Sequence, residues 1–176
     1  SLAEIAVKAF GAPGFSMAGG LPPGLEHTAY FTPDQSVYSN GTHVAEVEVD
    51  VDTGAVKILR YTVAHDCGLI VNPDGLKNQI EGGMIQSASW TLHEEVRFDK
   101  NGILSRDWAN YPIMTMPEVP KIAVELINRP TERALGAGEG SQGPAVAAIA
   151  NAFAHATGKR IRDLPFTADR VKKALA

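Results

Sequence analysis

Between residues 43 and 64, apolar and polar side chains alternate along the chain, as in a strand with one buried face. The odd-numbered positions from Ala45 to Val51 are apolar and share one face, and the even-numbered positions from Val44 to Asp50 share the other. The Asp52-Thr53-Gly54 sequence predicts a tight turn, after which Ala55–Ala64 returns as the partner strand. This region therefore predicts an antiparallel hairpin.

Helical spacing predicts four helices. The first covers LAEIAVKAF near the N-terminus, and the second begins with Asn72 as N-cap and Pro73 at its first position and runs to about Glu95. The third covers Pro144–Thr157 and ends at Gly158, and the last covers Ala168–Leu175. The inward positions of the third helix are predicted to be Val146, Ile149, Ala150 and Phe153.

The rest of the pattern adds a second hairpin, EEVRFD and ILSRDW around Lys100-Asn101-Gly102, and a strand at KIAVELIN. Hairpins interspersed with helices predict an α+β fold of β-hairpins with packed helices, without internal repeats. The Gly- and Pro-rich stretch 11–24 predicts a loop or boundary. We therefore expect residues 1–24 to form an N-terminal helix and loop, and residues 25–176 to form the main lobe.

Composition narrows the class of protein. With 44% hydrophobic and 20% charged residues the chain is typical of a globular protein, and a net charge of -4 argues against nucleic acid or an anionic membrane as partner. No apolar run reaches the roughly 20 residues of a membrane helix. The single cysteine, Cys67, excludes an internal disulfide and fits a cytoplasmic location. The five histidines show no metal-binding spacing, so no metal-ligating residues are predicted.

The second predicted helix carries an unusual stripe. Gln79, Gly82 or Gly83, and Gln86 fall at helical spacing, so two amides point the same way with bare backbone between them. Each glycine inside a helix costs roughly 1 kcal/mol relative to alanine, which suggests that the space is used. One interpretation is contact with a heterocyclic cofactor or substrate, because amides both donate and accept hydrogen bonds. The other is that the glycines admit a crossing helix and the glutamines face water.

A single acid, Glu139, stands in the glycine-rich sequence GAGEGSQG directly before the third helix. The segment 138–143 matches G-x-G-x-x-G, so a nucleotide-binding enzyme is one alternative. The preceding strand ends too early for that fingerprint, and an acid would repel a pyrophosphate at the helix N-terminus. A carboxylate flanked by glycines could instead act as a general base beside a closely approaching ligand, or could simply complement the helix dipole.

Three motifs in order, D-C-G-x-x-x-N-P, Q-I-E-G-G and G-x-G-E, give the chain a resemblance to a known family. Together they resemble the C-terminal part of the molybdenum-binding large subunit of the xanthine dehydrogenase and aldehyde oxidase family. The upstream sequence from Leu21 to Gly54 is similar to the branch that includes aerobic carbon monoxide dehydrogenase. The resemblance spans nearly the whole chain.

The resemblance implies a molybdopterin-dependent oxidoreductase, a hydroxylase that takes its oxygen from water and acts on an aldehyde, an N-heterocycle or a similar small substrate. It implies that Glu139 is the general base and Gln79 a cofactor contact. The further cofactor-binding residues it implies are Gly82, Gly83, Gln86, Gly138, Gly140 and Ser141. Two departures concern the surroundings of the cofactor, since Ser87 replaces a glycine that relatives have after the second glutamine, and G-S-Q-G replaces a proline-containing segment.

The same resemblance implies partners. The remainder of the large subunit would complete the site, and FAD and 2Fe-2S clusters would be carried by separate subunits, because one cysteine cannot ligate a cluster. We therefore expect the chain to be a fragment of a larger enzyme and to be inactive alone. A non-catalytic partner-binding lobe is the remaining alternative, and it would leave Glu139 in solvent with the glutamine stripe packed on protein.

Overall fold

The computed structural model describes residues 1–10, 24–26 and 28–176. These form two compact units, Ser1–Ser36 and Val37–Ala176. The sequence predicted a boundary after Gly24, whereas the compact units divide after Ser36. Nearly all of the loop predicted at 11–24 lies outside the described residues, as does His27.

The first unit contains helix α1, Leu2–Phe10, over the residues that the sequence predicted. Its first turn is capped by Ser1, whose hydroxyl accepts a hydrogen bond from the Glu4 backbone N–H at 3.3 Å. The N-terminal ammonium also contacts the Glu4 carboxylate at 2.6 Å. The Ser1 hydroxyl thus pairs one of the backbone N–H groups that a helix leaves unpaired at its start.

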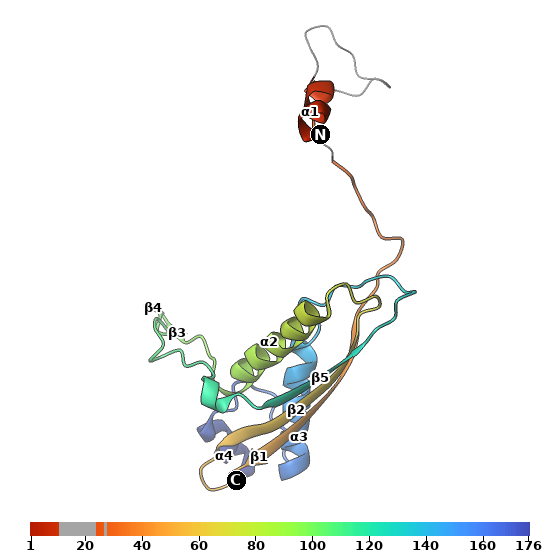
Figure 1. Cartoon of the computed structure of the whole chain (residues 1–176). Coiled ribbons are helices and arrows are strands. Elements are labelled where there is room, and N and C mark those ends of the chain that lie inside the picture. The colour runs from red at the N-terminus through yellow and green to blue at the C-terminus, as the bar shows by residue number, and fades with distance from the viewer. Residues whose placement is uncertain (11–23, 27) are drawn as a thin grey trace. The chain divides into compact units, whose positions relative to one another are not determined.

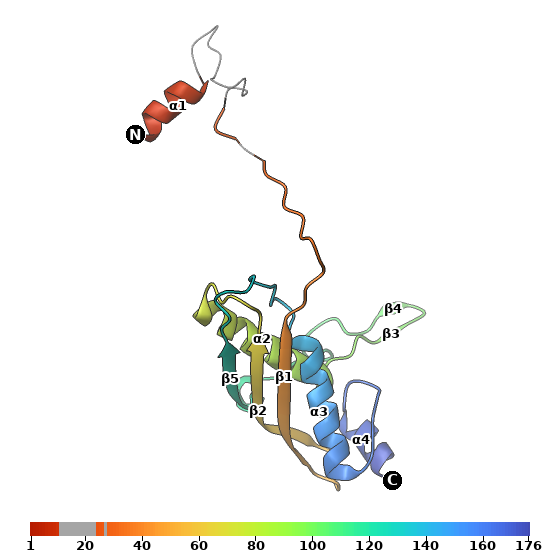
Figure 2. The same ribbon diagram turned by 90° about the vertical axis from the view of Figure 1, so that its right-hand side faces the viewer.

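The second unit is built on a three-stranded sheet in the order β1-β2-β5 (Figures 1 and 2). Strand β1, Asn40–Val49, pairs antiparallel with β2, Val56–Asp66, as the alternating pattern predicted. The turn between them is held by the Asp50 carboxylate, which accepts hydrogen bonds from the backbone N–H of Asp52 and Thr53. Strand β5, Lys121–Ile127, lies parallel to β2 on its other side.

One irregularity decides which residues of β2 face inward. The register between β1 and β2 shifts at Glu46/Val47, so that Leu59 is left without a partner between Arg60 and Ile58. Such a bulge changes the alternation of the strand. Ile58 is buried before it and Tyr61, Val63 and His65 after it, so His65 ends on the inner face of the sheet.

Helix α2, Pro73–Leu92, forms the crossover that parallel strands require between β2 and β5. It begins as predicted, with the Asn72 side chain accepting from the Gly75 backbone N–H at 2.9 Å and Pro73 in the first turn. It ends three residues before the predicted Glu95. His93 caps it, donating its backbone N–H to the Ser89 carbonyl at 2.8 Å.

Helix α3, Gln142–Thr157, packs along β1 and α2 on the same side of the sheet (Figure 2). It ends at Gly158 in the left-handed conformation, as predicted. Of the four predicted inward positions, Ile149 and Phe153 are buried, and Val146 and Ala150 are partly exposed. Helix α4, Ala168–Leu175, closes the chain and buries Val171.

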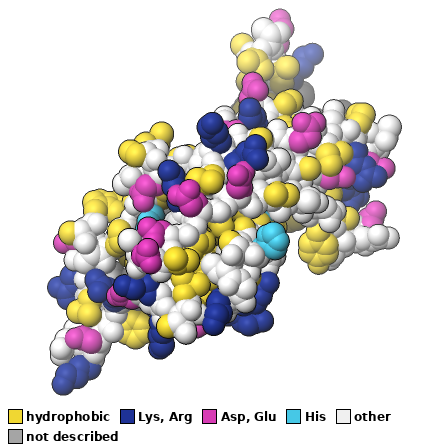
Figure 3. Space-filling view, turned by 90° about the horizontal axis from the view of Figure 1, so that it is seen from below, with side chains coloured by type: hydrophobic (Ala, Val, Ile, Leu, Met, Phe, Trp, Pro, Cys, Tyr) yellow, Lys and Arg dark blue, Asp and Glu magenta, His cyan; other side chains and the backbone are white. Residues whose placement is uncertain are grey.

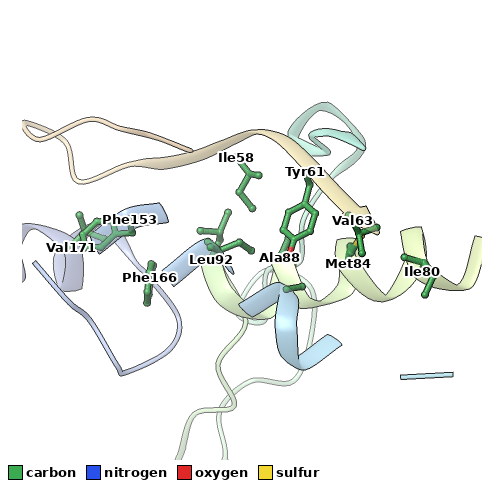
Figure 4. Close-up of a cluster of buried hydrophobic side chains, with 12 residues drawn as sticks. Ile58, Tyr61, Val63, Ile80, Met84, Ala88, Leu92, Phe153, Phe166 and Val171 are labelled. Atoms are coloured by element: carbon green, nitrogen blue, oxygen red, sulfur yellow. The ribbon is translucent and has the colours of Figure 1, made fainter. Parts of the chain in front are cut away.

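The core lies between the sheet and these helices. Figure 4 shows β2 side chains Ile58, Tyr61 and Val63 facing α2 residues, with Phe153, Phe166 and Val171 at the other end. The α+β fold class is confirmed, with a mixed sheet in place of separate hairpins. On the face shown in Figure 3, acidic and basic side chains are interspersed, so that face presents no field of a single sign.

The second predicted hairpin is much smaller than expected. Strands β3, Phe98–Asp99, and β4, Gly102–Ile103, contain two residues each and pair only with one another. They project from the sheet and helices (Figure 1). A short 3-10 helix, η2, Met116–Glu118, then leads into β5.

Candidate functional site

The two loops that follow β2 and β5 are joined at the end of the sheet. The Cys67 carbonyl accepts from the Leu135 backbone N–H at 2.8 Å, and the Gly68 carbonyl accepts from the Arg129 N–H at 3.0 Å. The Arg129 guanidinium also pairs with the Asp66 carboxylate at 3.2 Å. The D-C-G motif thus fixes the path of the segment 128–141, which leads to Glu139.

Gly68 and Cys67 have structural reasons for their identity. Gly68 has a φ of +75°, and a Cβ there would overlap the Arg133 carbonyl oxygen. Cys67 is buried, and burial raises the pKa of its thiol, so it stays protonated at neutral pH. A packing role for this cysteine therefore accounts for its position.

The amide stripe of α2 meets the loop that carries Glu139. Gln79 donates from Nε2 to the Gly138 carbonyl oxygen at 2.5 Å. Two turns further along, the Gln86 Oε1 accepts from the Gln142 side-chain amide at 3.2 Å. The two glutamines that were singled out in the sequence are therefore bound to Gly138, directly before the acid, and to Gln142, three residues after it.

Ser141 fastens the loop that carries Glu139 to helix α2 by a hydrogen bond. It is buried, and its hydroxyl donates to the Ile80 carbonyl oxygen at 3.2 Å. Gly83 makes this approach possible, because a Cβ on Gly83 would overlap the Ser141 hydroxyl. Gly83 thus serves internal packing, as the more ordinary of the two sequence interpretations proposed.

Gly140 packs against His65 and Ser39. A Cβ there would lie 2.8 Å from His65 Cε1 and 3.0 Å from the Ser39 hydroxyl, closer than side chains normally approach. Glu139 itself is exposed, and its backbone carbonyl accepts from the Gln142 N–H at 3.1 Å. Among the described residues its carboxylate has no hydrogen-bond partner. The Glu139 side chain therefore points outward, while Gly138, Gly140 and Ser141 beside it are all in contact with other parts of the chain.

Two glycines of the site are not explained by packing within the described chain. A Cβ built on Gly82 or on Gly138 would meet nothing within 4 Å. Gly82 lies in the middle of α2, where glycine is unfavourable by roughly 1 kcal/mol relative to alanine. Bare backbone at both positions, beside two side-chain amides and an exposed carboxylate, fits a bulky ligand with hydrogen-bonding edges, such as a pterin cofactor.

The arrangement does not fit a dinucleotide site. Residues 128–141 separate the end of β5 from the start of α3, whereas the fingerprint requires the loop to pass directly from strand to helix. The exposed Glu139 also stands at the N-terminal end of α3, where a phosphate would have to bind.

Comparison with known proteins identifies the family. The molybdopterin cofactor-binding domain matches residues 1–120. This chain belongs to that family. The resemblance to the molybdenum-binding large subunits of xanthine dehydrogenase, aldehyde oxidase and carbon monoxide dehydrogenase is thereby confirmed.

Two curated relatives illustrate the similarity. The chain is 48% identical over 132 residues to a nicotinate dehydrogenase component of Pseudomonas putida, covering 75% of this chain and 11% of that protein. It is 31% identical over 184 residues to the carbon monoxide dehydrogenase large chain of Hydrogenophaga pseudoflava, covering 99% and 22%. The chain thus spans only 11% and 22% of the lengths of these two relatives.

Solved structures agree with the fold. Quinoline 2-oxidoreductase from Pseudomonas putida 86 superposes with a TM-score of 0.74 and 31% identity, covering 89% of this chain and 21% of that one. Carbon monoxide dehydrogenase from Oligotropha carboxidovorans superposes with a TM-score of 0.75 and 25% identity, covering 99% and 22%. The mixed sheet and its helices are therefore those of part of a molybdenum hydroxylase large chain.

Sequence reasoning overlooked two residues beside this site, His43 and His65. His65 is 0% exposed, and burial lowers the pKa of both imidazoles. His43 Nδ1 lies 3.1 Å from the Tyr61 hydroxyl. The signal was present, because His65 continues the two-residue alternation of Tyr61 and Val63, which marks the inner face of β2.

Proposed function

We propose that this chain is the C-terminal part of the large subunit of a molybdenum hydroxylase, with Glu139 as its general base. The observation that carries the proposal is the convergence of two sequence-distant motifs. Gln79 and the Ile80 carbonyl of α2 hold Gly138 and Ser141, on either side of the acid, and Gly83 leaves room for Ser141. Gly82 and Gly138 remain bare on the open side.

These residues would form one wall of the cofactor site. Gln79 and Gln86 offer amide edges, and the bare backbone at Gly82 and Gly138 allows close approach. When bound, a molybdopterin cofactor supplies a two-electron acceptor next to the oxidised carbon. In this proposal Gln79 and Gln86 would orient that group by hydrogen bonds, and Glu139 would accept a proton beside it.

Glu139 is suited to accept a proton from the oxygen nucleophile derived from water. An ionised carboxylate accepts hydrogen bonds and cannot donate them. No described residue donates a hydrogen bond to the Glu139 carboxylate. The backbone on both sides of it is held by the α2 contacts, so little ordering would remain when substrate binds. A positioned base of this kind typically contributes 10²- to 10⁴-fold to a rate.

The proposed substrate is a small N-heterocycle, with an aldehyde as the other possibility. Nicotinate dehydrogenase, nicotine 6-hydroxylase and isoquinoline 1-oxidoreductase are all among the similar proteins. An indole-3-acetaldehyde oxidase also matches, over 59% of the chain. We favour the heterocycle because the chain's identity to the nicotinate enzyme, 48% over 132 residues, exceeds its 39% over 110 residues to the aldehyde oxidase, although the other two heterocycle enzymes are 34% identical.

The site requires further protein to close it. Gln79, Gly82, Gln86 and Glu139 are all exposed, so this chain supplies one side only. Seven large apolar side chains between residues 96 and 116 are also at least 43% exposed, namely Val96, Phe98, Ile103, Leu104, Trp108, Ile113 and Met116. Exposed apolar surface of this extent is typical of a protein interface. We propose that the remainder of the large subunit covers it, with FAD and 2Fe-2S subunits as electron-transfer partners.

The test is Glu139→Gln in the complete large subunit assembled with its partner subunits. Glutamine keeps the shape of the side chain and removes its ability to take a proton, so turnover should fall by at least 10²-fold. Molybdenum content, measured by mass spectrometry, should stay at the wild-type level. Glu125→Gln is the matched control, because Glu125 is an exposed acid of β5.

Near-normal turnover by Glu139→Gln would remove the base assignment. A loss of molybdenum equal to the loss of turnover would instead indicate that Glu139 holds the cofactor. The chain without the rest of the large subunit is expected to show no turnover and no bound molybdenum.

A further inference from the structure

His65 is enclosed between two glycines that are far apart in the sequence. On one side a Cβ at Gly41 would lie 3.2 Å from His65 Nδ1, and on the other a Cβ at Gly140 would lie 2.8 Å from His65 Cε1. Gly41 is the direct partner of His65 across the β1-β2 ladder. Gly140 is the residue after Glu139. The imidazole therefore links the sheet to the turn that presents the acid.

The contact at Gly140 is too close to tolerate a side chain there. Ser39 Oγ lies 3.0 Å from the same Cβ position and His65 Nε2 lies 3.4 Å from it. Gly140 does not have a positive φ, so its backbone conformation alone would accept alanine. Close contact with the imidazole, and not backbone strain, accounts for glycine at this position.

The chemistry of His65 is not explained by packing. Both ring nitrogens are buried and have no hydrogen-bond partner among the described residues. A buried polar group without a partner is unfavourable, so an apolar side chain would suit a purely space-filling role better. His43 Nε2 is in the same condition and lies 3.1 Å from the Cβ position of Gly41. His65 is thus a buried polar side chain in contact with the turn that carries Glu139.

We propose that His65 is a positioning residue for Glu139. Its ring sets how close the Gly140 backbone comes to the sheet, and the Gly140 backbone sets where the Glu139 carboxylate is presented. This inference rests on the proposed role of Glu139. It assigns no chemical step to His65, which acts only through the neighbouring turn.

The contact itself can be tested in the 176-residue chain without any cofactor. Gly140→Ala should lower the melting temperature, because its methyl group would meet the imidazole. In a His65→Ala background the ring is absent and the Ser39 hydroxyl can rotate, so the same Gly140→Ala change should cost much less. Additive losses in this double-mutant cycle would overturn the contact, since independent sites add and coupled ones do not.

The positioning role is tested in the complete assembled enzyme by a matched pair, His65→Gln and His65→Asn. Both keep a polar amide, but only glutamine is long enough to reach Gly140. We expect His65→Asn to lower kcat at least tenfold with KM within twofold and molybdenum content unchanged. His65→Gln should retain most of the wild-type kcat. His155→Gln, at an exposed position on α3, is the control.

Wild-type kcat in His65→Asn would overturn the proposal. Equal losses of kcat in His65→Asn and His65→Gln, in proportion to their losses in melting temperature, would overturn it too. Glu139→Gln is measured in parallel to separate the two hypotheses. If Glu139→Gln is inactive and His65→Asn is normal, only the positioning role fails. If Glu139→Gln is active, the proposed function fails whatever the histidine variants do.

Discussion

Among single residues, the neighbours of Glu139 are fixed, whereas the Glu139 side chain is exposed and makes no hydrogen bond to the described residues. Gly138 is bound by Gln79, and Ser141 is bound by the Ile80 carbonyl. The sequence singled out Glu139 and the two glutamines, because glycines around one acid and amides at helical spacing are visible in it. It assigned Gln79 and Ser141 to cofactor binding and did not predict their hydrogen bonds to Gly138 and Ile80. Which glycine packs and which stays open could not be predicted, since that depends on how two distant segments meet.

The buried histidines predict a pH dependence of stability. Burial lowers the pKa of His65 from its ordinary 6.5, and it does the same for His43, with the nearby His65 as a smaller cause. The unfolded chain therefore takes up protons below about pH 6.5 that the folded chain does not, so stability should fall as pH drops through that value. Melting temperatures of the 176-residue chain from about pH 8 to about pH 5 would measure it.

A variant separates this effect from that of the carboxylates. Glu118 has a lowered pKa, caused first by hydrogen bonds from Thr115, so its contribution is lost only below about pH 4.5. His65→Gln should make the melting temperature less dependent on pH between about 7 and 5. An unchanged slope in that variant would show that His65 has the same pKa in the folded and the unfolded chain, and would contradict the lowered pKa.

At the level of elements, the sequence predicted the helices and the first hairpin because each is determined by local pattern. Helix α2 was predicted from its N-cap and apolar spacing, and β1 and β2 from strict alternation. The parallel pairing of β5 with β2 was not predicted, because it depends on the crossover through α2 and not on either strand alone. The bulge at Leu59 was not predicted either, because it appears only once the register of β1 against β2 is known.

Helix α2 offers a matched pair of glycine substitutions. Gly83→Ala should destabilise the chain by about 1–3 kcal/mol, because its methyl group would displace Ser141 and the start of α3. Gly82→Ala should stabilise it by up to about 1 kcal/mol, because its methyl group meets nothing and alanine favours the helix. Urea denaturation of both variants would test the pair, and equal effects of one sign would contradict the packing described.

For the whole molecule, the described surface carries features that internal packing leaves unexplained. None of the described helices has the length and hydropathy of a membrane span. Large apolar side chains nevertheless stand exposed from Val96 to Met116, and the open glycines lie beside the candidate base. The family could be predicted from motif order, and the α+β class from hairpin patterns interspersed with helical ones. Substrate-side geometry could not, because this chain spans 11% of the nicotinate dehydrogenase component it resembles.

We propose that Gly82 is bare because the cofactor lies against it in the assembled enzyme. The most direct test is the molybdenum content of the complete large subunit carrying Gly82→Ala, compared with the stability of the same variant in the 176-residue chain. We predict a chain at least as stable as wild type and an assembled enzyme with at least tenfold less molybdenum. Full molybdenum content with normal turnover in Gly82→Ala would contradict the account.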